Sequence, residues 1–386
     1  MASSERQKQE EEDDDERGRR RAKSLSFLRG HRPLWEFVGP SEALELGRLG
    51  YRELGDVHHL LDSDDETIPP ERKAKLKEGL RRERKPVIVN AADLLEHEEI
   101  LTPVITFCRG LDAAIGGGIR RRKITEICGG PGTGKTQLAT QLCADATIPK
   151  AFGGAGGSAI YVDCDGSFSV GRLTELAEAL TAHVRKLAVK KHRSSGVLKT
   201  TTSRDDDGTS GATATCLHEE YDVAHVLRKV SRARVLDDLD VVAAVEVILD
   251  RLVAAAVKEE DVVLVVIDSL ASHFRWFRPE ADKDARSRLL ARVAVDLATL
   301  AIRFDVAVVV VNQLTTRNDQ QTAPALGAHW SHVPDCRLLL EKHDDGRRTC
   351  KVLKGFLPDD PTVDFTIDHR GIRDKNTQHT PTTTTA

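Results

Sequence analysis

Short apolar runs rich in valine and isoleucine alternate with helical patterns from about residue 101 to residue 374. These runs lack the alternation of polar and apolar positions that marks a strand with one wet face. A strand that is apolar on both faces is typical of a parallel sheet covered by helices. The pattern therefore predicts an α/β core with a mainly parallel, twisted sheet flanked by helices. The clearest predicted strands are Ile124–Cys128, Ala159–Val162, Val262–Ile267 and Val306–Val311.

The N-terminal third has a different pattern. Leu54, Val57 and Leu61 fall on one face of a short helix, and a basic helical stretch, Glu71–Arg82, follows Pro69 and Pro70. We therefore expect a small helical domain over residues 33–83. Residues 84–100, with Pro86 and the extended run Val87–Val89, are expected to link it to the core.

Three segments are too polar or too simple in composition to form a core. Residues 1–32 carry an acidic block, Glu10–Glu16, followed at once by the basic run Arg17–Lys23. Like charges in blocks favour disorder, and the basic run fits either a nuclear address, a DNA-touching arm or a solvated stretch with no partner. Residues 190–215 are interpreted as a low-complexity surface insertion, and residues 375–386 as a second disordered tail.

Composition narrows the class of protein. The formal net charge is −4, so binding to nucleic acid would need local basic patches. No apolar run is long enough to span a membrane, and the first residues lack the apolar segment of a secretory signal. None of the seven cysteines forms a Cys-x-x-Cys pair, which favours reduced cysteines in an intracellular core over zinc ligation.

The chemistry centres on the loop after the first predicted strand. Gly129-Gly130-Pro131-Gly132-Thr133-Gly134-Lys135-Thr136 satisfies the P-loop pattern, with a strand before it and a helical run, Gln137–Ala144, after it. Glycines let backbone N–H groups surround phosphate oxygens, and the helix N-terminus favours negative charge. We expect Lys135 to reach the β- and γ-phosphates of ATP and Thr136 to bind Mg²⁺.

Polar side chains end three other predicted strands. Asp268 follows Val262–Ile267 and is the candidate for supporting the Mg²⁺. Asp165 follows the second strand and is the candidate for positioning the attacking water. Gln313, next to Asn312 after Val306–Val311, can sense the γ-phosphate without neutralising it.

The order of these motifs resembles that of a known family. The segments that carry the resemblance are Ile105–Cys108, Gly116–Gly118, Thr125–Thr136, Val162–Phe168, Ile267–Ser269, Arg286–Leu290, Asn312–Gln313, Pro324–Trp330 and Phe365–Asp374. Over about residues 100–374 the chain resembles the RecA-type recombinases. More narrowly it is similar to the eukaryotic accessory paralogues of the strand-exchange recombinase, with the C paralogue of that Rad group nearest in pattern.

The resemblance implies a RecA-like, ATP- and Mg²⁺-dependent ATPase that acts in homologous recombination and double-strand break repair. Expected partners are single-stranded DNA, branched DNA as a second substrate, other recombinase paralogues in a hetero-oligomer, and the main strand-exchange recombinase. The implied compartment is the nucleus, with the cytoplasm as a second location. No membrane partner is expected.

Two loops face DNA in this family. The first falls at Phe274–Arg278, where aromatic rings and arginines interleave, so Arg275, Trp276 and Arg278 are the DNA-binding candidates there. The second spans about Thr315–Gly327 and supplies Arg317. A packed helix end with solvated arginines is the alternative for the first segment. Lys354 lies where the family can place a lysine against a neighbouring subunit's nucleotide.

One departure affects the chemistry. The family often has Glu where this chain has Asp165. Asp is shorter by one C–C bond, roughly 1.5 Å, and a misplacement of about 1 Å can cost about 10²-fold in rate. The sequence therefore predicts ATP binding with slow turnover.

Three functions compete. The first is an ATP-gated, DNA-binding mediator of recombination that assists loading of the main recombinase. The second is a nucleotide-stabilised scaffold whose partners contact the DNA, which the short Asp165 and the acidic net charge favour. The third, a RecA-like motor of another class such as a replicative helicase, is disfavoured because the chain has no second P-loop and no extra helicase motif.

Overall fold

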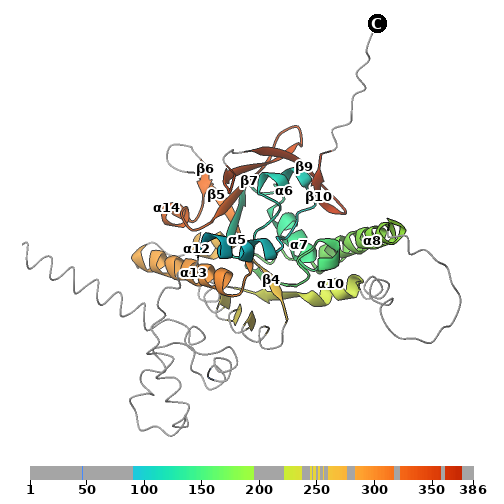
Figure 1. Cartoon of the computed structure of the whole chain (residues 1–386). Helices are drawn as coiled ribbons and strands as arrows, with labels where there is room; N and C mark the ends of the chain where they lie inside the picture. The colour runs from blue at the N-terminus through green and yellow to red at the C-terminus, as the bar shows by residue number, and fades with distance from the viewer. Residues whose placement is uncertain are drawn as a thin grey trace, which may run out of the picture. The chain divides into compact units, whose positions relative to one another are not determined.

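The structure is a computed structural model of the whole chain (Figure 1). Residue contacts divide the chain into two units, residues 1–90 with 250–259 and residues 91–249 with 260–386. Nearly all of the description concerns the second unit, and apart from residues 46 and 375 the predicted N-terminal domain and both tails lie outside the described residues. The structure describes residues 46, 90–194, 221–236, 244–245, 247–248, 251–252, 255, 260–275, 283–316, 322–357 and 361–375.

The described residues form a ten-stranded sheet in the order β10-β9-β8-β7-β1-β5-β4-β2-β3, with β6 paired to β5. The strands are β1 Ile124–Gly129, β2 Ser158–Asp163, β3 Val230–Arg234, β4 Val262–Asp268, β5 Ala307–Thr316, β6 Thr322–Pro324, β7 Cys336–Lys342, β8 Arg348–Lys354, β9 Thr362–Asp368 and β10 Gly371–Asp374. The pairings from β7 through β1, β5, β4 and β2 to β3 are parallel. Those from β7 to β10 are antiparallel.

The predicted α/β class with a mainly parallel sheet is confirmed. Each of the four predicted strands is present, and β1 and β4 are buried along their whole length, as a strand covered on both faces must be. The antiparallel strands differ, because β7 alternates buried and half-buried positions over its first five residues. That alternation is typical of a sheet with one wetter face.

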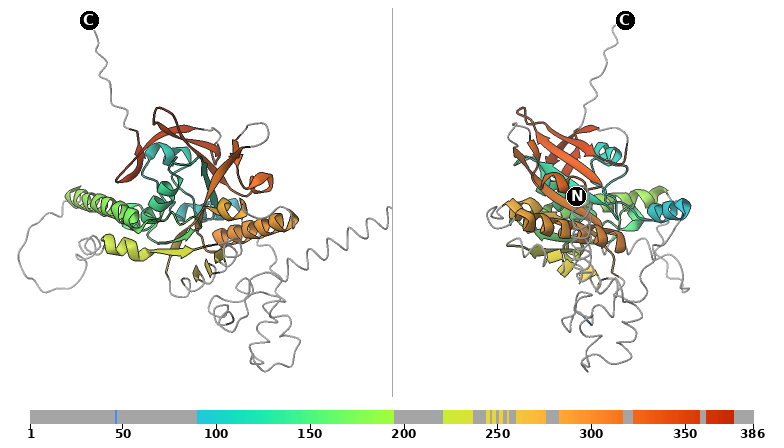
Figure 2. Two further views of the ribbon diagram at one scale, coloured as in Figure 1. Left: turned by 180° about the vertical axis from the view of Figure 1, so that it is seen from behind. Right: turned by 90° about the vertical axis from the view of Figure 1, so that its left-hand side faces the viewer.

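Helices cover both faces of the parallel sheet. The α-helices in the described part of the chain are α5 Ala91–Ile100, α6 Arg109–Ala114, α7 Lys135–Asp145, α8 Val170–Ser194, α10 Val223–Lys229, α12 Leu270–Arg275, α13 Lys283–Arg303 and α14 Gly327–Trp330. Helix α7 packs against β1, β2, β4 and β5 and is covered by α8. Helix α13 packs against β1 and β5 from the other side, as the two views of Figure 2 show. None of the helices in the described part of the chain is long and apolar enough to cross a membrane.

Three boundaries differ from the sequence-based expectation. The second half of the expected linker is helix α5, which begins at Ala91. Strand β5 does not end at Val311 but continues to Thr316, because β6 pairs with its last residues. Helix α8 continues to Ser194, so the expected insertion starts within a helix, and residues 195–220 lie outside the described part.

The last strand is locked to α7 by a buried amide. The Gln141 Oε1 atom accepts a hydrogen bond from the Ile372 backbone N–H at 2.5 Å, and Gln141 Nε2 donates to the Thr106 carbonyl at 2.6 Å. Gly371 has φ +108°, and a Cβ atom there would collide with Gln141 Oε1 and approach Leu176 Cδ2 within 2.9 Å. The closing strand therefore requires glycine both for its backbone conformation and for space.

We expect Gly371→Ala to lower the free energy of unfolding by roughly 3 kcal/mol, the sum of left-handed strain and overpacking. The matched control is Gly346→Ala, because Gly346 also has a positive φ, +80°, but nothing lies within 4 Å of its added Cβ. The control should lose only about 1 kcal/mol. Urea denaturation measures both losses, and equal losses would show that the contact with Gln141 is unimportant.

Candidate functional site

The P-loop leaves the carboxyl end of β1 at the centre of the sheet. Gly129 pairs in register with Gln313 of β5 on one side and Leu340 of β7 on the other. A Cβ atom at Gly129 would collide with the Leu340 carbonyl oxygen, and one at Gly134 would come within 2.5 Å of Ile367. Gly134 also has φ +111° where it caps α7. The loop can therefore follow this path only with glycine at both positions.

Lys135, the first residue of α7, folds back over the loop. Its Nζ atom donates to the carbonyl oxygens of Gly129 at 3.0 Å and Gly130 at 2.7 Å. Burial lowers the pKa of this ammonium group, while the nearby Asp268 and Asp165 carboxylates oppose that shift. Lys135 is thus a partly desolvated cation held at the mouth of the loop, a strong position for an anionic phosphate.

Thr136 and Asp268 meet, as the sequence predicts for a magnesium site. The Thr136 hydroxyl donates to Asp268 Oδ2 at 2.7 Å, and the buried Tyr161 hydroxyl donates to the same oxygen at 2.6 Å. Burial raises the pKa of the Asp268 carboxyl, although both hydrogen bonds favour its charged form. Tyr161 was not identified from the sequence, where it reads as an ordinary apolar strand residue.

The donor set fits ATP with Mg²⁺. Mg²⁺ prefers hard oxygen ligands and is usually held by one or two side chains together with substrate phosphates, which matches the Thr136 hydroxyl and the Asp268 carboxylate. Among the described residues there is no cluster of His, Cys, Asp and Glu able to hold a metal without a ligand. The Ser269 hydroxyl, next to Asp268, is buried and lacks a hydrogen-bond partner within that same part of the chain. The glycine cradle supplies backbone donors for the phosphates.

Two carboxylates lie at the end of β2, Asp163 as its last residue and Asp165 just after it, and only Asp165 is exposed to solvent. Asp165 is exposed, and its charge acts on Lys135 and Asp268. Asp163 is fully buried and binds the guanidinium of Arg232 at 2.6 Å, with Arg234 at 3.4 Å. Asp163 also accepts the backbone N–H groups of residues 166 and 167, so it shapes the turn that carries Asp165. The sequence did not identify this positioning role.

Gln313 lies inside β5, beside the first glycine of the P-loop. Its backbone N–H donates to the side-chain oxygen of Asn312 at 2.8 Å, and the buried Asn312 amide donates in turn to Glu126 Oε1 at 2.6 Å. Glu126 was not among the expected site residues, because a charged residue three positions before a P-loop carries no motif. The structure thus joins Gln313 to the strand that delivers the nucleotide loop.

The expected DNA-binding residues stay predictions. Arg275 ends α12, but its side chain, like residues Trp276, Arg278 and Arg317, lies outside the described part. Phe274, which precedes these candidates, is buried, with 1% of its surface exposed, and so is not available to stack on a base. Residue 274 belongs to the core because its helix, α12, packs against β5.

Lys354 is held within its own chain. Its Nζ atom donates to the carbonyl oxygen of Pro334 at 2.5 Å and to that of His332 at 3.3 Å. These bonds fix the direction of the side chain at the end of β8. The expected contact with a neighbouring subunit's nucleotide stays a prediction.

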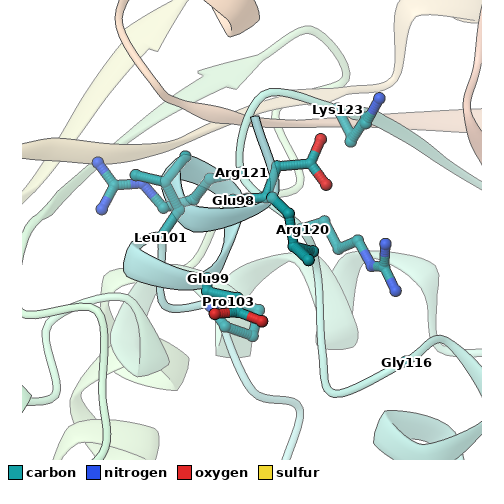
Figure 3. A pocket seen from close by; sticks show the side chains of 9 residues that line it. Glu98, Glu99, Leu101, Pro103, Gly116, Arg120, Arg121 and Lys123 are labelled. Atoms are coloured by element: carbon teal, nitrogen blue, oxygen red, sulfur yellow. The ribbon is translucent and has the colours of Figure 1, made fainter. Parts of the chain in front are cut away.

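A separate cavity of about 310 Å³ lies beside α5 (Figure 3). It is bordered by Glu98 and Glu99 from the helix and by basic residues that precede β1. These basic side chains already have partners: Arg121 contacts Asp261 at 3.1 Å, Lys123 contacts Asp335 at 3.8 Å, and Arg120 lies over the Phe356 ring. The cavity is therefore a poor site for an anion such as a nucleotide.

Comparison with known proteins identifies the family. The Rad51 family profile matches residues 97–189 and 212–375, which leaves out much of the expected insertion. "DNA repair protein RAD51 homolog 3" of Cricetulus griseus is 34% identical over 287 residues, which cover 74% of this chain and 72% of that protein. Its namesake in Dictyostelium discoideum is 32% identical over 300 residues, 76% and 71% of the two chains. "DNA repair and recombination protein RadA" of Aeropyrum pernix is 30% identical over 346 residues, 87% and 94% of the two chains.

The raised pKa of Asp268 predicts a pH dependence of stability in the absence of nucleotide. The folded state holds this proton more tightly than the unfolded state, so stability falls as pH rises from the unfolded pKa through the folded pKa. Asp268→Asn removes the titration and keeps an oxygen acceptor for Thr136 and Tyr161. The free energy of unfolding of the wild type should therefore fall relative to that of the variant as the pH rises from about 4, the unfolded pKa of an aspartate. Urea denaturation across that range checks it, and a constant difference would contradict it.

Proposed function

The chain belongs to the Rad51 family, and from this premise we propose that it is an ATP- and Mg²⁺-dependent, DNA-binding ATPase of homologous recombination and DNA double-strand break repair. One observation carries the proposal. Lys135, Thr136 and Asp268 meet at the carboxyl edge of the parallel sheet, with Gln313 in register beside the P-loop. That edge is where ligands bind in open α/β sheets.

The phosphates of ATP would lie against the loop Gly129–Gly134, with Lys135 leaving its present carbonyl partners to bind them. Thr136 and Asp268 would hold Mg²⁺, which supplies charge neutralisation for phosphoryl transfer when it is bound. Tyr161 keeps the Asp268 carboxylate in one orientation through their hydrogen bond. Asp268 and Lys135 are both desolvated by burial, and a charge interacts more strongly with its neighbours where water is scarce.

Asp165 and Gln313 are the proposed catalytic residues beside Lys135. Asp165 is exposed at the same edge and can accept a hydrogen bond from an attacking water. Its short side chain leaves the carboxylate further from the phosphates than a glutamate would reach, so turnover would be slow.

DNA binding is assigned to Arg275, Trp276, Arg278 and Arg317, whose rings and guanidinium groups suit single-stranded DNA. Branched DNA is a second substrate in this proposal. The relatives named for RAD51 homolog 3 support a role within a hetero-oligomer of recombinase paralogues that helps the main recombinase load on single-stranded DNA in the nucleus.

A nucleotide-stabilised scaffold is the second candidate. Two observations favour it, the short carboxylate at Asp165 and the net charge of −4, which weakens general attraction to DNA. In that case ATP would hold a subunit interface and partner subunits would contact the DNA.

Binding to fluorescent single-stranded DNA separates the two candidates. We expect binding that requires ATP·Mg²⁺, is lost in Lys135→Ala, and weakens at least about 10-fold between about 50 mM and about 200 mM salt, because arginines release counterions from the phosphates. The triple substitution of Arg275, Arg278 and Arg317 by Ala should reduce both the affinity and the salt dependence. Nucleotide-loaded protein that binds no DNA would favour the scaffold.

Steady-state hydrolysis tests the assignment of Asp165. Asp165→Glu should raise kcat for ATP at least about 10-fold, because the longer side chain carries the carboxylate toward the phosphates. Asp165→Ala, the control, should lower kcat below the wild-type value. The assignment is wrong if the glutamate variant is no faster than wild type and the alanine variant is no slower.

A further inference from the structure

Glu126 is a fully buried carboxylate in the strand that delivers the P-loop. Three side-chain donors from three elements converge on it. Asn312 of β5 and Trp330 of α14 donate to Oε1, at 2.6 Å and 3.0 Å, and Arg337 of β7 donates to Oε2. The carboxylate therefore bridges β1 to both of its neighbouring strands and to α14.

The Asn312 amide can satisfy its contacts in one orientation only. Its Nδ2 atom donates to the Glu126 carboxylate, so its Oδ1 atom points the other way. There Oδ1 accepts the backbone N–H of Gln313 at 2.8 Å. The charge on Glu126 thus decides which end of the Asn312 amide meets the backbone of Gln313.

Trp330 connects the same oxygen to the segment beyond β6. Its ring is buried, with 1% of its surface exposed, and its indole N–H shares Glu126 Oε1 with Asn312. The Asn312 amide and the Trp330 indole therefore depend on the same acceptor oxygen. Arg337 supplies a counter-charge for the buried carboxylate through a direct ion pair.

We propose that Glu126 is a positioning residue for the nucleotide site: it orients Asn312, and through it Gln313, and it links that orientation to Trp330. The inference rests on the proposed ATPase function and adds a residue that acts without touching the nucleotide. Its consequence is a defined polarity of hydrogen bonds, from Gln313 N–H to Asn312 to Glu126.

The polarity can be inverted by substitution. In Glu126→Gln the amide oxygen should turn to the charged Arg337, which presents the new NH₂ group to Asn312 Nδ2 and to the Trp330 indole N–H, so that donors face one another. Asn312 must then flip, so the Gln313 N–H loses its acceptor. Adding Asn312→Asp restores an acceptor on both sides, for the NH₂ group introduced at position 126 and for the Gln313 N–H.

We expect Glu126→Gln to lower kcat for ATP hydrolysis about 10-fold with the KM for ATP within about twofold, because positioning acts on the reacting state. The double variant Glu126→Gln/Asn312→Asp should recover most of kcat. Asn312→Asp alone, with two carboxylates facing each other, should be slower than the double variant. A merely structural role predicts a lower free energy of unfolding in Glu126→Gln with the kcat of the folded protein unchanged. Unchanged kcat in Glu126→Gln, or no recovery in the double variant, overturns the proposal.

A second readout does not need hydrolysis. In a background with Trp35→Phe and Trp276→Phe, the emission of Trp330 should change when ATP·Mg²⁺ binds, and Glu126→Gln should abolish that change. If the wild type binds ATP without hydrolysing it, the proposed ATPase function fails, and the emission still decides the role of Glu126. If Trp330 emission does not change when nucleotide binds to the protein that carries Trp35→Phe and Trp276→Phe but keeps Glu126, the inference is overturned.

Discussion

The parallel pairing of β1 with β5 on one side and β7 on the other is the constraint on which the site depends. It brings the first glycine of the P-loop between Gln313 and the Leu340 carbonyl, with no room for a side chain. Strand β4 also pairs in parallel with β5, and parallel strands have their carboxyl ends at one edge of the sheet. Asp268, the last residue of β4, therefore lies beside Thr136. The apolar character of these strands therefore determines where the charged residues meet.

Three buried carboxylates surround the nucleotide loop, and each is satisfied by several donors. Glu126 binds Asn312, Trp330 and Arg337; Asp163 binds two arginines; Asp268 binds two hydroxyls. Burying a charge is costly unless it is paired and hydrogen-bonded, so these contacts offset a penalty more than they add stability. What they provide is fixed direction, which phosphoryl transfer needs because positioning supplies most of its catalysis.

The sequence predicted the four central strands, the P-loop and the place of Asp268 beside that loop, because each rests on a local pattern or on strand ends that must share an edge. It missed Tyr161, Asp163 and Glu126, because their partners are far away in the chain; Glu126, for example, meets residues 186 to 211 positions later. The extension of β5 depends on pairing with β6, which no local pattern shows.

The central claim is that the nucleotide edge and the DNA-binding segments are energetically coupled in one chain. Coupling free energies are reciprocal, so DNA must change the affinity for nucleotide by the factor by which nucleotide changes the affinity for DNA. The most direct measurement is isothermal titration of a non-hydrolysable ATP analogue with Mg²⁺, with and without saturating single-stranded DNA. The account predicts that DNA tightens nucleotide binding at least about 5-fold. An identical nucleotide Kd in the two titrations would contradict it.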